Sequence, residues 1–429
     1  MMAMLLACCS LMHGAHAFLP FKVNHDAVII PTAAEGPTGK HQRPESILKG
    51  VELLVKEMYN QQNRWDIEEL GEFETVTGGV GKADAMASAA EWLTGRLVYV
   101  GGTLDNATVL QPGSSGHPPI VFGEWVQDAG ELPQEILDRP GQSERLPTIL
   151  IYGQYDVEAP KTSLLSWRSP WRLEREDGIM YGAGIAGGKG ALLMAIQALE
   201  MLLRAAESYY SPSFVKSIPL NIKFLFEGEG ACGSEGLLDA LKAHAHLFKG
   251  VDVILAAAAA GTPGSLSMGP HDGPADRAAD SAWGAGEKLP VGANLDARGT
   301  AAHVALAEEL HAPVTVFGVG LGTPAGAKGG ESLSEAHYNA GRLAWARLLL
   351  ALGEPHTARQ LMADTAARTG GGAGDGVDGN EAGSEEGEKG AACARDGGEQ
   401  GGDGGGGSEE GEVGPACGGG ADSGAHDEL

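Results

Sequence analysis

The residues best suited to chemistry lie in four short segments that contain or follow apolar runs. The segments are Pro147–Val157, Met180–Gly190, Phe224–Ser234 and Val251–Ala258. Gln154 and Asp156 follow the first apolar run, and Glu227 and Glu229 follow the third. Carboxylates at such places can bind metal ions or accept a proton from water. The second segment instead offers two glycines, Gly187-Gly188, and the fourth ends in alanine.

The four segments resemble the aminoacylase–carnosinase family of dizinc metallopeptidases in their order, their spacing and the identity of many residues. In that family they read Tyr-Gly-His-Tyr-Asp-Val, Tyr-Gly-Arg-Gly-Ala-Ser-Asp-Asp-Lys-Gly, Phe-Glu-Gly-Glu-Glu-Glu-Ile-Gly-Ser and Val-Leu-Ile-Ser-Asp. The scaffold residues are kept here, while the residues that bind zinc are replaced. The resemblance therefore identifies the chain as a divergent member that lacks most metal ligands.

The resemblance also assigns each site residue of the family to one position. Only Asp156, which matches the Asp that orients the first ligand, is retained. The first ligand His falls on Gln154, the bridging Asp on Gly187, the general-base Glu on Gly230, the adjacent ligand Glu on Ala231, the ligand Asp on Ala258 and the last His on Lys328. Gln is a poor zinc ligand, Gly and Ala are none, and the ammonium of Lys would repel a cation. We therefore expect no cofactor where the family holds two zinc ions.

Three functional hypotheses follow. The favoured one is a catalytically inactive scaffold that binds a peptide or protein in the vestigial cleft. In the second, a different register brings Glu227 or Glu229 to a metal, giving an active hydrolase of dipeptides or N-acyl amino acids with relocated ligands. The third is a degenerate gene product without function, suggested by the run Ala257–Ala260 and a short lid region. Histidines outside the four segments, such as His303 and His311, are interpreted as ordinary surface residues.

Strand-like and helix-like segments alternate along the chain. Strands are expected at 120–125, 148–152, 221–226, 251–255 and 314–319, and helices at 44–60, 83–97, 188–204, 234–246, 301–310 and 335–352. This alternation predicts an α/β domain with a mostly parallel sheet and helices on both faces. Ligands bind at the carboxyl ends of strands in such sheets, which is where Gln154, Glu229 and Ala258 are expected.

The peptidase-like domain is expected to be discontinuous, formed by residues 25–260 and 297–352. The resemblance implies a lid and dimerisation domain between these parts, which would need on the order of 100 residues for four strands and two helices. Ala258 and Arg298 are only 40 positions apart, and residues 261–296 are rich in Gly, Pro and Ala, as is typical of a loop. We therefore expect the lid to be largely absent and the chain to be a monomer.

Both ends of the chain carry targeting signals. Residues 1–17 are predicted to be a signal peptide, because the apolar run Met4–Met12 is too short to span a bilayer and Ala15-His16-Ala17 forms a cleavage pattern. The last four residues match a retention signal of the endoplasmic reticulum (ER): His426, Asp427, Glu428 and Leu429. These signals predict the ER lumen and a retention receptor as partner. Asn106 begins an N-glycosylation acceptor, Asn-Ala-Thr, suited to that compartment.

Acidic residues dominate the charge of the chain, with a formal net charge of -27. Residues 369–429 are rich in Gly and acidic residues, and we expect them to form a disordered tail. This acidity argues against nucleic acid as a partner. We also expect no membrane span.

Overall fold

The computed structural model describes residues 44–370, apart from gaps of one to three residues and longer gaps at 101–105, 160–168, 211–217, 259–263, 268–277, 279–296 and 319–330. The expected signal peptide, Lys328 and nearly all of the expected acidic tail with its four terminal residues lie outside the described residues.

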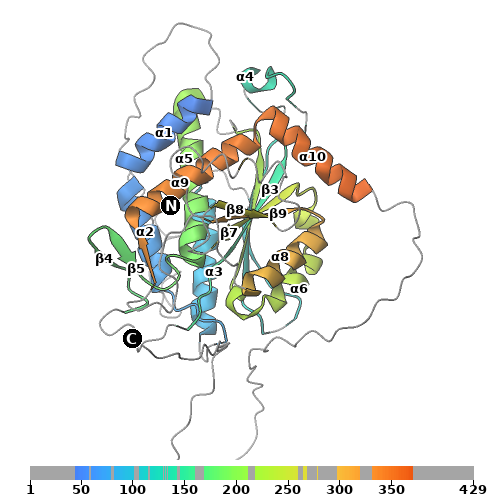
Figure 1. Ribbon diagram of the computed structural model, residues 1–429. Coiled ribbons are helices and arrows are strands. Elements are labelled where there is room, and N and C mark those ends of the chain that lie inside the picture. Colours follow the sequence, from blue (N-terminus) through green and yellow to red (C-terminus); the bar gives the residue numbers. More distant parts are fainter. Residues whose placement is uncertain are drawn as a thin grey trace, which may run out of the picture.

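A seven-stranded mixed sheet forms the centre of the fold (Figure 1). Its strands are β1 (Asn106–Leu110), β2 (Ile120–Trp125), β3 (Thr148–Gln154), β6 (Asn221–Glu227), β7 (Val253–Ala258), β8 (Gly264–Ser267) and β9 (Val314–Gly318), in the order β1-β2-β6-β3-β7-β9-β8. The four central strands β6, β3, β7 and β9 run parallel, and β1, β2 and β8 are antiparallel to their neighbours. The expected α/β fold is confirmed, with its parallel strands in the middle of the sheet.

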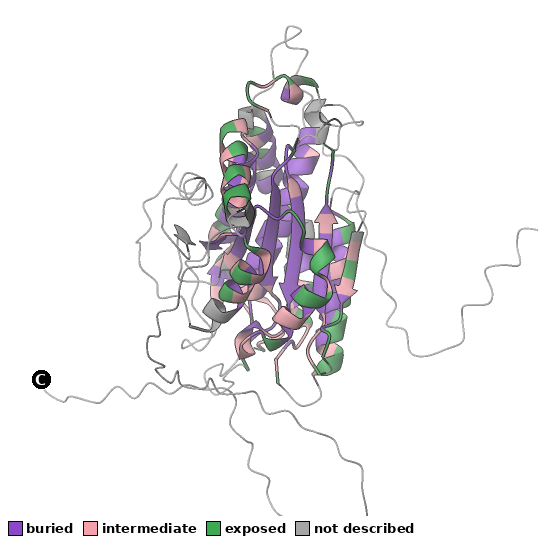
Figure 2. Cartoon of the chain, turned by 90° about the vertical axis from the view of Figure 1, so that its right-hand side faces the viewer, coloured by how far each residue is buried: buried purple, intermediate pink, exposed green. Residues whose placement is uncertain are grey.

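Helices cover both faces of this sheet (Figure 1). One face carries α1 (Pro44–Glu57), α2 (Tyr59–Glu72), α3 (Ala83–Val98), α5 (Gly188–Tyr210) and α9 (Glu335–Leu352), and the other carries α6 (Glu235–Ala243) and α8 (Ala297–Leu310). Strand β3 shows why helices are needed on both faces, because its alternate side chains are apolar on each side. Ile149 and Ile151 pack in the core under the first group of helices, and Leu150 and Tyr152 pack in the core under the second. Figure 2 shows the buried residues concentrated in the sheet and on the helix sides toward it.

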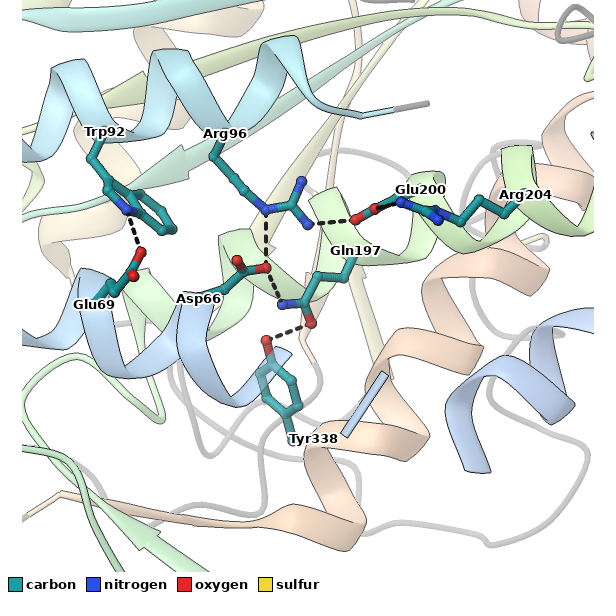
Figure 3. A network of polar contacts seen from close by, with 8 residues as sticks. All are labelled: Asp66, Glu69, Trp92, Arg96, Gln197, Glu200, Arg204 and Tyr338. Atoms are coloured by element: carbon teal, nitrogen blue, oxygen red, sulfur yellow. Dashed lines mark hydrogen bonds and ion pairs between the residues drawn. The ribbon is translucent and has the colours of Figure 1, made fainter. Parts of the chain in front are cut away.

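A buried polar network joins the helices of the first face (Figure 3). Arg96 of α3 binds Asp66 of α2, with 2.9 Å from Nε to Oδ2, and also binds Glu200 of α5. Gln197 Nε2 donates to the same Asp66 oxygen at 2.9 Å, and Tyr338 Oη of α9 donates to Gln197 Oε1 at 2.9 Å. Four helices are thus tied together by polar contacts inside an otherwise apolar layer.

A second, small antiparallel sheet has the strand order β10-β5-β4. Its strands are β4 (Glu174–Glu176), β5 (Ile179–Tyr181) and β10 (Ser332–Ser334). Because β10 pairs with β5, the residue before β10, Glu331, is held next to the loop that follows β5. Three-residue strands carry too little periodicity for sequence reasoning to find them.

Three differences from the expected elements concern the helix expected at 44–60, the loop expected at 261–296 and the end of the domain. The helix expected at 44–60 ends at Glu57, and a second helix, α2, begins at Tyr59. Part of the expected loop 261–296 forms strand β8, because residues 264–267 pair with β9 and become the edge strand of the sheet. Helix α10 (Pro355–Gly370) continues past the expected domain end and takes in the first two residues of the expected tail. Proline favours the first turn of a helix, which explains the start of α10. Among the described residues, no helix is both long and apolar enough to cross a membrane.

Candidate functional site

The carboxyl ends of the central strands bring together residues that are far apart in the sequence. Strands β3 and β6 are parallel, and their registered pairs end at Gln154 and Glu227. Strand β7 lies on the other side of β3 and ends at Ala258. The turn Gly230–Cys232 follows β6, and Gly187 and Gly188 lie at the start of α5. The positions singled out from the sequence therefore lie together at the carboxyl ends of the central strands. The exception is Lys328, which lies outside the described residues.

Gln154 and Gly230 are in direct contact. A Cβ atom added at position 230 would lie 2.0 Å from Gln154 Cδ and 2.1 Å from its Nε2. The carboxamide therefore fills the space that a side chain at position 230 would need. It is fixed there by a hydrogen bond from Gln154 Nε2 to Tyr152 Oη at 3.1 Å.

Gly188 also lies close to the end of β3. A Cβ atom at position 188 would come within 2.3 Å of the Gln154 carbonyl oxygen, so any other residue would force the backbone to shift. Its neighbour Gly187 donates its backbone N–H to Glu331 Oε1 at 2.8 Å. The loop before α5 is thus held by the backbone of β3 on one side and by a carboxylate on another.

Asp156 binds the turn after β6 through its carboxylate. It accepts hydrogen bonds from the backbone N–H groups of Gly230 at 3.0 Å and Ala231 at 2.8 Å, and from Thr77 Oγ1 at 2.6 Å. Burial raises the pKa of the Asp156 carboxyl, and these hydrogen bonds oppose the shift. The resemblance assigns this residue to orienting a ligand His; in the structure its contacts position the turn instead.

Glu227 is a buried carboxyl group beside Gln154. Its Oε1 accepts hydrogen bonds from Tyr152 Oη and from Ser234 Oγ, the latter at 2.7 Å. Its Oε2 is buried without a hydrogen-bond partner among the described residues. Burial, opposed by the hydrogen bonds and reinforced by nearby Asp156, raises the pKa of Glu227 to about 8. This group is therefore mostly protonated at neutral pH.

His303 is wrongly interpreted by sequence reasoning as a surface residue. It is buried on α8, and its ring meets the Tyr152 ring edge-on at 5.8 Å between centroids. Its Nδ1 has no hydrogen-bond partner among the described residues, and burial lowers the pKa of His303 to about 4. The sequence pattern of α8 could have predicted this burial, because His303 lies beside Ala302 and Leu306, which form the buried face of the helix.

Glu229 is already engaged by other groups. Both of its carboxylate oxygens contact His117 Nδ1, at 3.1 and 2.9 Å, and the backbone N–H of Gly236 donates to Oε2 at 2.9 Å. Glu229 thereby connects the loop before β2 to the first turn of α6. Sequence reasoning misses His117, because nothing near it in the chain suggests this pairing.

Lys189 is a further buried ionisable group that sequence reasoning treats only as scaffold. Its ammonium donates to the Phe73 carbonyl oxygen at 2.7 Å and lies 5.7 Å from the centroid of the Trp171 ring. Burial lowers the pKa of Lys189 to about 7, although Glu331 and Asp156 favour its charged form.

A pair of zinc ions does not fit the side chains at the matched positions. Two ions need several His or carboxylate ligands, whereas the described positions supply an amide, two glycines and two alanines. Within the described ranges, no group of three or more His, Cys, Asp or Glu side chains is arranged to hold a metal ion.

Comparisons with known proteins agree with this architecture. Residues 150–351 match the family model described as Peptidase family M20/M25/M40. The chain is similar to a Beta-Ala-His dipeptidase of Mus musculus, 30% identical over 145 residues, which is 33% of this chain and 28% of that protein. It is also similar to the Cys-Gly metallodipeptidase DUG1 of Saccharomyces cerevisiae, 32% identical over 127 residues, which is 29% of this chain and 24% of that protein. The matched part thus spans only about a quarter of the length of these relatives.

Two solved structures share the fold. Human carnosine dipeptidase 1 has a TM-score of 0.51 at 12% identity, covering 73% of this chain and 100% of that one. The dipeptidase Dug1p from Saccharomyces cerevisiae has a TM-score of 0.51 at 13% identity, covering 73% and 99%.

The expectation of no cofactor is corrected by these comparisons. The matched family is one of dizinc peptidases, and one relative is named a metallodipeptidase. The expectation is wrong because it considers only the positions of the family's metal ligands. Other side chains of the same scaffold can also bind a metal ion.

Proposed function

Since residues 150–351 belong to Peptidase family M20/M25/M40, we propose that this protein is a metallopeptidase-like scaffold that does not hydrolyse peptides and that binds a peptide or protein ligand. The binding region in this proposal is the edge of the sheet where β3, β6 and β7 end. One observation carries it: the side chain of Gln154 lies in the space next to Gly230, where the family places its general base.

The loss of the base supports the absence of hydrolysis. General-base catalysis contributes about 10²–10⁴ in rate, and neither Gly230 nor Ala231 can accept a proton. The nearby carboxyl groups do not replace it. Asp156 is bound to the turn, Glu229 to His117 and Gly236, and Glu227 is mostly protonated at neutral pH.

The binding role is supported by the kind of groups that remain. The relatives are named for small peptides, Beta-Ala-His and Cys-Gly, so we propose small peptides or the end of a longer chain as the ligand class. A carboxamide such as that of Gln154 can both donate to and accept from a peptide group. Such neutral contacts favour binding without activating water.

The location proposed for this role is the ER lumen, and its support is the sequence of the two ends. The apolar N-terminal run, the sequon at Asn106 and the terminal residues His426–Leu429 agree with one another. The partners proposed are the peptide or protein ligand and a retention receptor, with no nucleic acid, and the chain is proposed to act as a monomer.

A hydrolase with relocated ligands is the second candidate. Two buried atoms that could bind a metal ion favour this candidate. Glu227 Oε2 and His303 Nδ1 both lack hydrogen-bond partners among the described residues, and both residues contact Tyr152. Unpaired buried atoms of this kind are uncommon in folded proteins, and an unseen ion or water is one explanation.

Binding and hydrolysis can be measured in the same sample. The purified full chain is incubated with β-alanyl-histidine or cysteinylglycine, with zinc or manganese added. Binding is followed by calorimetry, and the dipeptide is then quantified by chromatography. We expect a saturable binding signal and intact dipeptide, with weaker binding by Gln154→Ala. Free amino acids above the level of a protein-free blank would support the second candidate, and no binding would contradict the proposed role.

A further inference from the structure

We propose that the loop 184–187 is a carboxylate-binding site, which the side chain of Glu331 occupies within the same chain. A carboxylate ligand, such as the C-terminal carboxylate of a peptide, would bind there when the Glu331 side chain is displaced. The identity of that peptide ligand rests on the proposed function, whereas the site itself does not.

Three backbone donors converge on the Glu331 carboxylate. The N–H of Gly184 donates to Oε2 at 2.6 Å, and the N–H groups of Ala186 and Gly187 donate to Oε1 at 2.8 Å each. Both oxygens are therefore bound, as in the recognition of a free carboxylate by successive backbone N–H groups. No described side chain of the loop is needed for this recognition, so any carboxylate of similar size can make the same contacts.

The loop has the backbone shape that this geometry requires. Gly184 has φ +81°, a conformation that other residues adopt at a cost. A Cβ atom there would also lie 2.9 Å from Val157 Cγ1 and 3.1 Å from Lys189 Cγ and Cδ. The donors are thus held in place by packing that exists independently of Glu331.

Burial raises the pKa of Glu331, while the three backbone N–H groups and Lys189 oppose this shift and stabilise the carboxylate. The loop leads into α5, a helix of 23 residues whose N-terminal end carries partial positive charge. The buried ammonium of Lys189, in the first turn of α5, interacts favourably with Glu331 and with Asp156. The three backbone donors that bind the carboxylate therefore point to this ligand class, and Lys189 stabilises the carboxylate when its amine is protonated.

Glu331 belongs to a different part of the chain from the loop that it fills. It directly precedes β10, and its carbonyl oxygen accepts from Gly182 N at 3.2 Å, so its backbone is anchored beside the loop. Its side chain is the movable part of this contact. An external carboxylate would have to displace this side chain to reach the three donors.

Chemical rescue tests the site. In Glu331→Ala, the amides of Gly184, Ala186 and Gly187 lose their acceptor, and we expect their hydrogen exchange to accelerate by about tenfold or more. Added formate or acetate should restore slow exchange at these amides in a saturable manner. Acetamide, which is neutral, should not restore it. Mass spectrometry of the full chain resolves the segment 182–188.

The matched control is Glu335→Ala. Glu335 lies in the first turn of α9, and its carboxylate binds Arg175 at 2.5 Å. Its replacement should leave exchange in 182–188 unchanged. Glu331→Gln keeps the shape of the side chain but only one carbonyl acceptor, so faster exchange at one or more of the three amides is expected even if Glu331→Ala does not fold.

The outcomes separate the site from the proposed function. A folded Glu331→Ala that ignores formate and acetate, or a Glu331→Gln with unchanged exchange, would overturn the site. The last arm compares glycylglycine with its C-terminal amide on Glu331→Ala, and we expect only the free carboxylate to slow exchange. Rescue by formate without any effect of glycylglycine would keep the carboxylate site and count against peptide as its ligand.

Discussion

The carboxamide of Gln154 lies against the backbone of Gly230 so closely that a Cβ atom at position 230 would be 2.0 Å from Gln154 Cδ. The two positions are therefore coupled: a large residue at one requires a small or displaced one at the other. The family pattern, a His and a Glu at these places, and the present pair, Gln and Gly, are two different solutions to the same packing problem.

This coupling predicts a non-additive pair of substitutions. Gly230→Ala should lower the free energy of unfolding by about 1–3 kcal/mol, as expected for overpacking. In the background of Gln154→Ala the same change should cost much less, because the conflicting side chain is gone. Urea unfolding of the two single variants and the double variant measures this coupling. Additive free energies would mean that the two side-chain positions do not share space.

The pH dependence of stability should report the buried carboxyl of Glu227. Its pKa rises from the ordinary value of 4.5 to about 8 on folding, so the folded state binds more protons between these values. The free energy of unfolding contributed by this group therefore falls as pH rises through that window. Glu227→Gln lacks the titration, while Lys189 and His303 titrate in both proteins and cancel in the comparison.

Relative to the wild type, Glu227→Gln should thus gain stability between about pH 5 and about pH 8. Chemical unfolding at several pH values measures the difference between the two proteins. Parallel curves across this range would show that Glu227 titrates normally in the folded chain.

The buried network of Figure 3 predicts that replacing Arg96 lowers the free energy of unfolding much more than replacing Arg204. Arg96→Met removes the partner of Asp66 and Glu200, whose side chains are buried, and should cost about 3–5 kcal/mol of unfolding free energy. Arg204→Ala is the matched control, because Arg204 binds the same Glu200 but its side chain is 38% exposed. It should cost at most about 1 kcal/mol. Similar costs for both variants would contradict the assigned burial.

The four C-terminal residues predict retention in the secretory pathway. Deletion of His426–Leu429 should move the protein from the cell to the medium, since the retention receptor reads this end. Immunoblots of cells and medium measure the distribution, and addition of one residue after Leu429 provides a control that leaves the rest of the sequence intact. Full retention of both variants would argue against this signal.

Sequence reasoning finds the elements with strong periodicity. Strand β2 and helix α9 have the expected bounds, and the register of β3 against β6 brings Gln154 and Glu227 to one edge. Parallel strands with continuous apolar runs end at a common edge, so the meeting of the matched positions also follows from the sequence.

Contacts between distant segments are not available from the sequence. Glu331 binds the loop before α5 only because β10 pairs with β5, and each of these strands has three residues. His303 is buried because α8 packs on the sheet beside Tyr152, and His117 meets Glu229 from the loop before β2. Local patterns carry no information on such pairings, whose partners lie far apart along the chain.

Hydrolysis of dipeptides by the purified chain tests the central proposal most directly. The rate with β-alanyl-histidine and cysteinylglycine is measured with zinc or manganese present, beside a variant that combines Gln154→His, Gly187→Asp, Gly230→Glu, Ala231→Glu and Ala258→Asp. The account predicts no turnover above the blank for the wild type and measurable turnover or metal uptake for the rebuilt variant. Steady hydrolysis by the wild type, reduced by Glu227→Gln or His303→Ala, would contradict it.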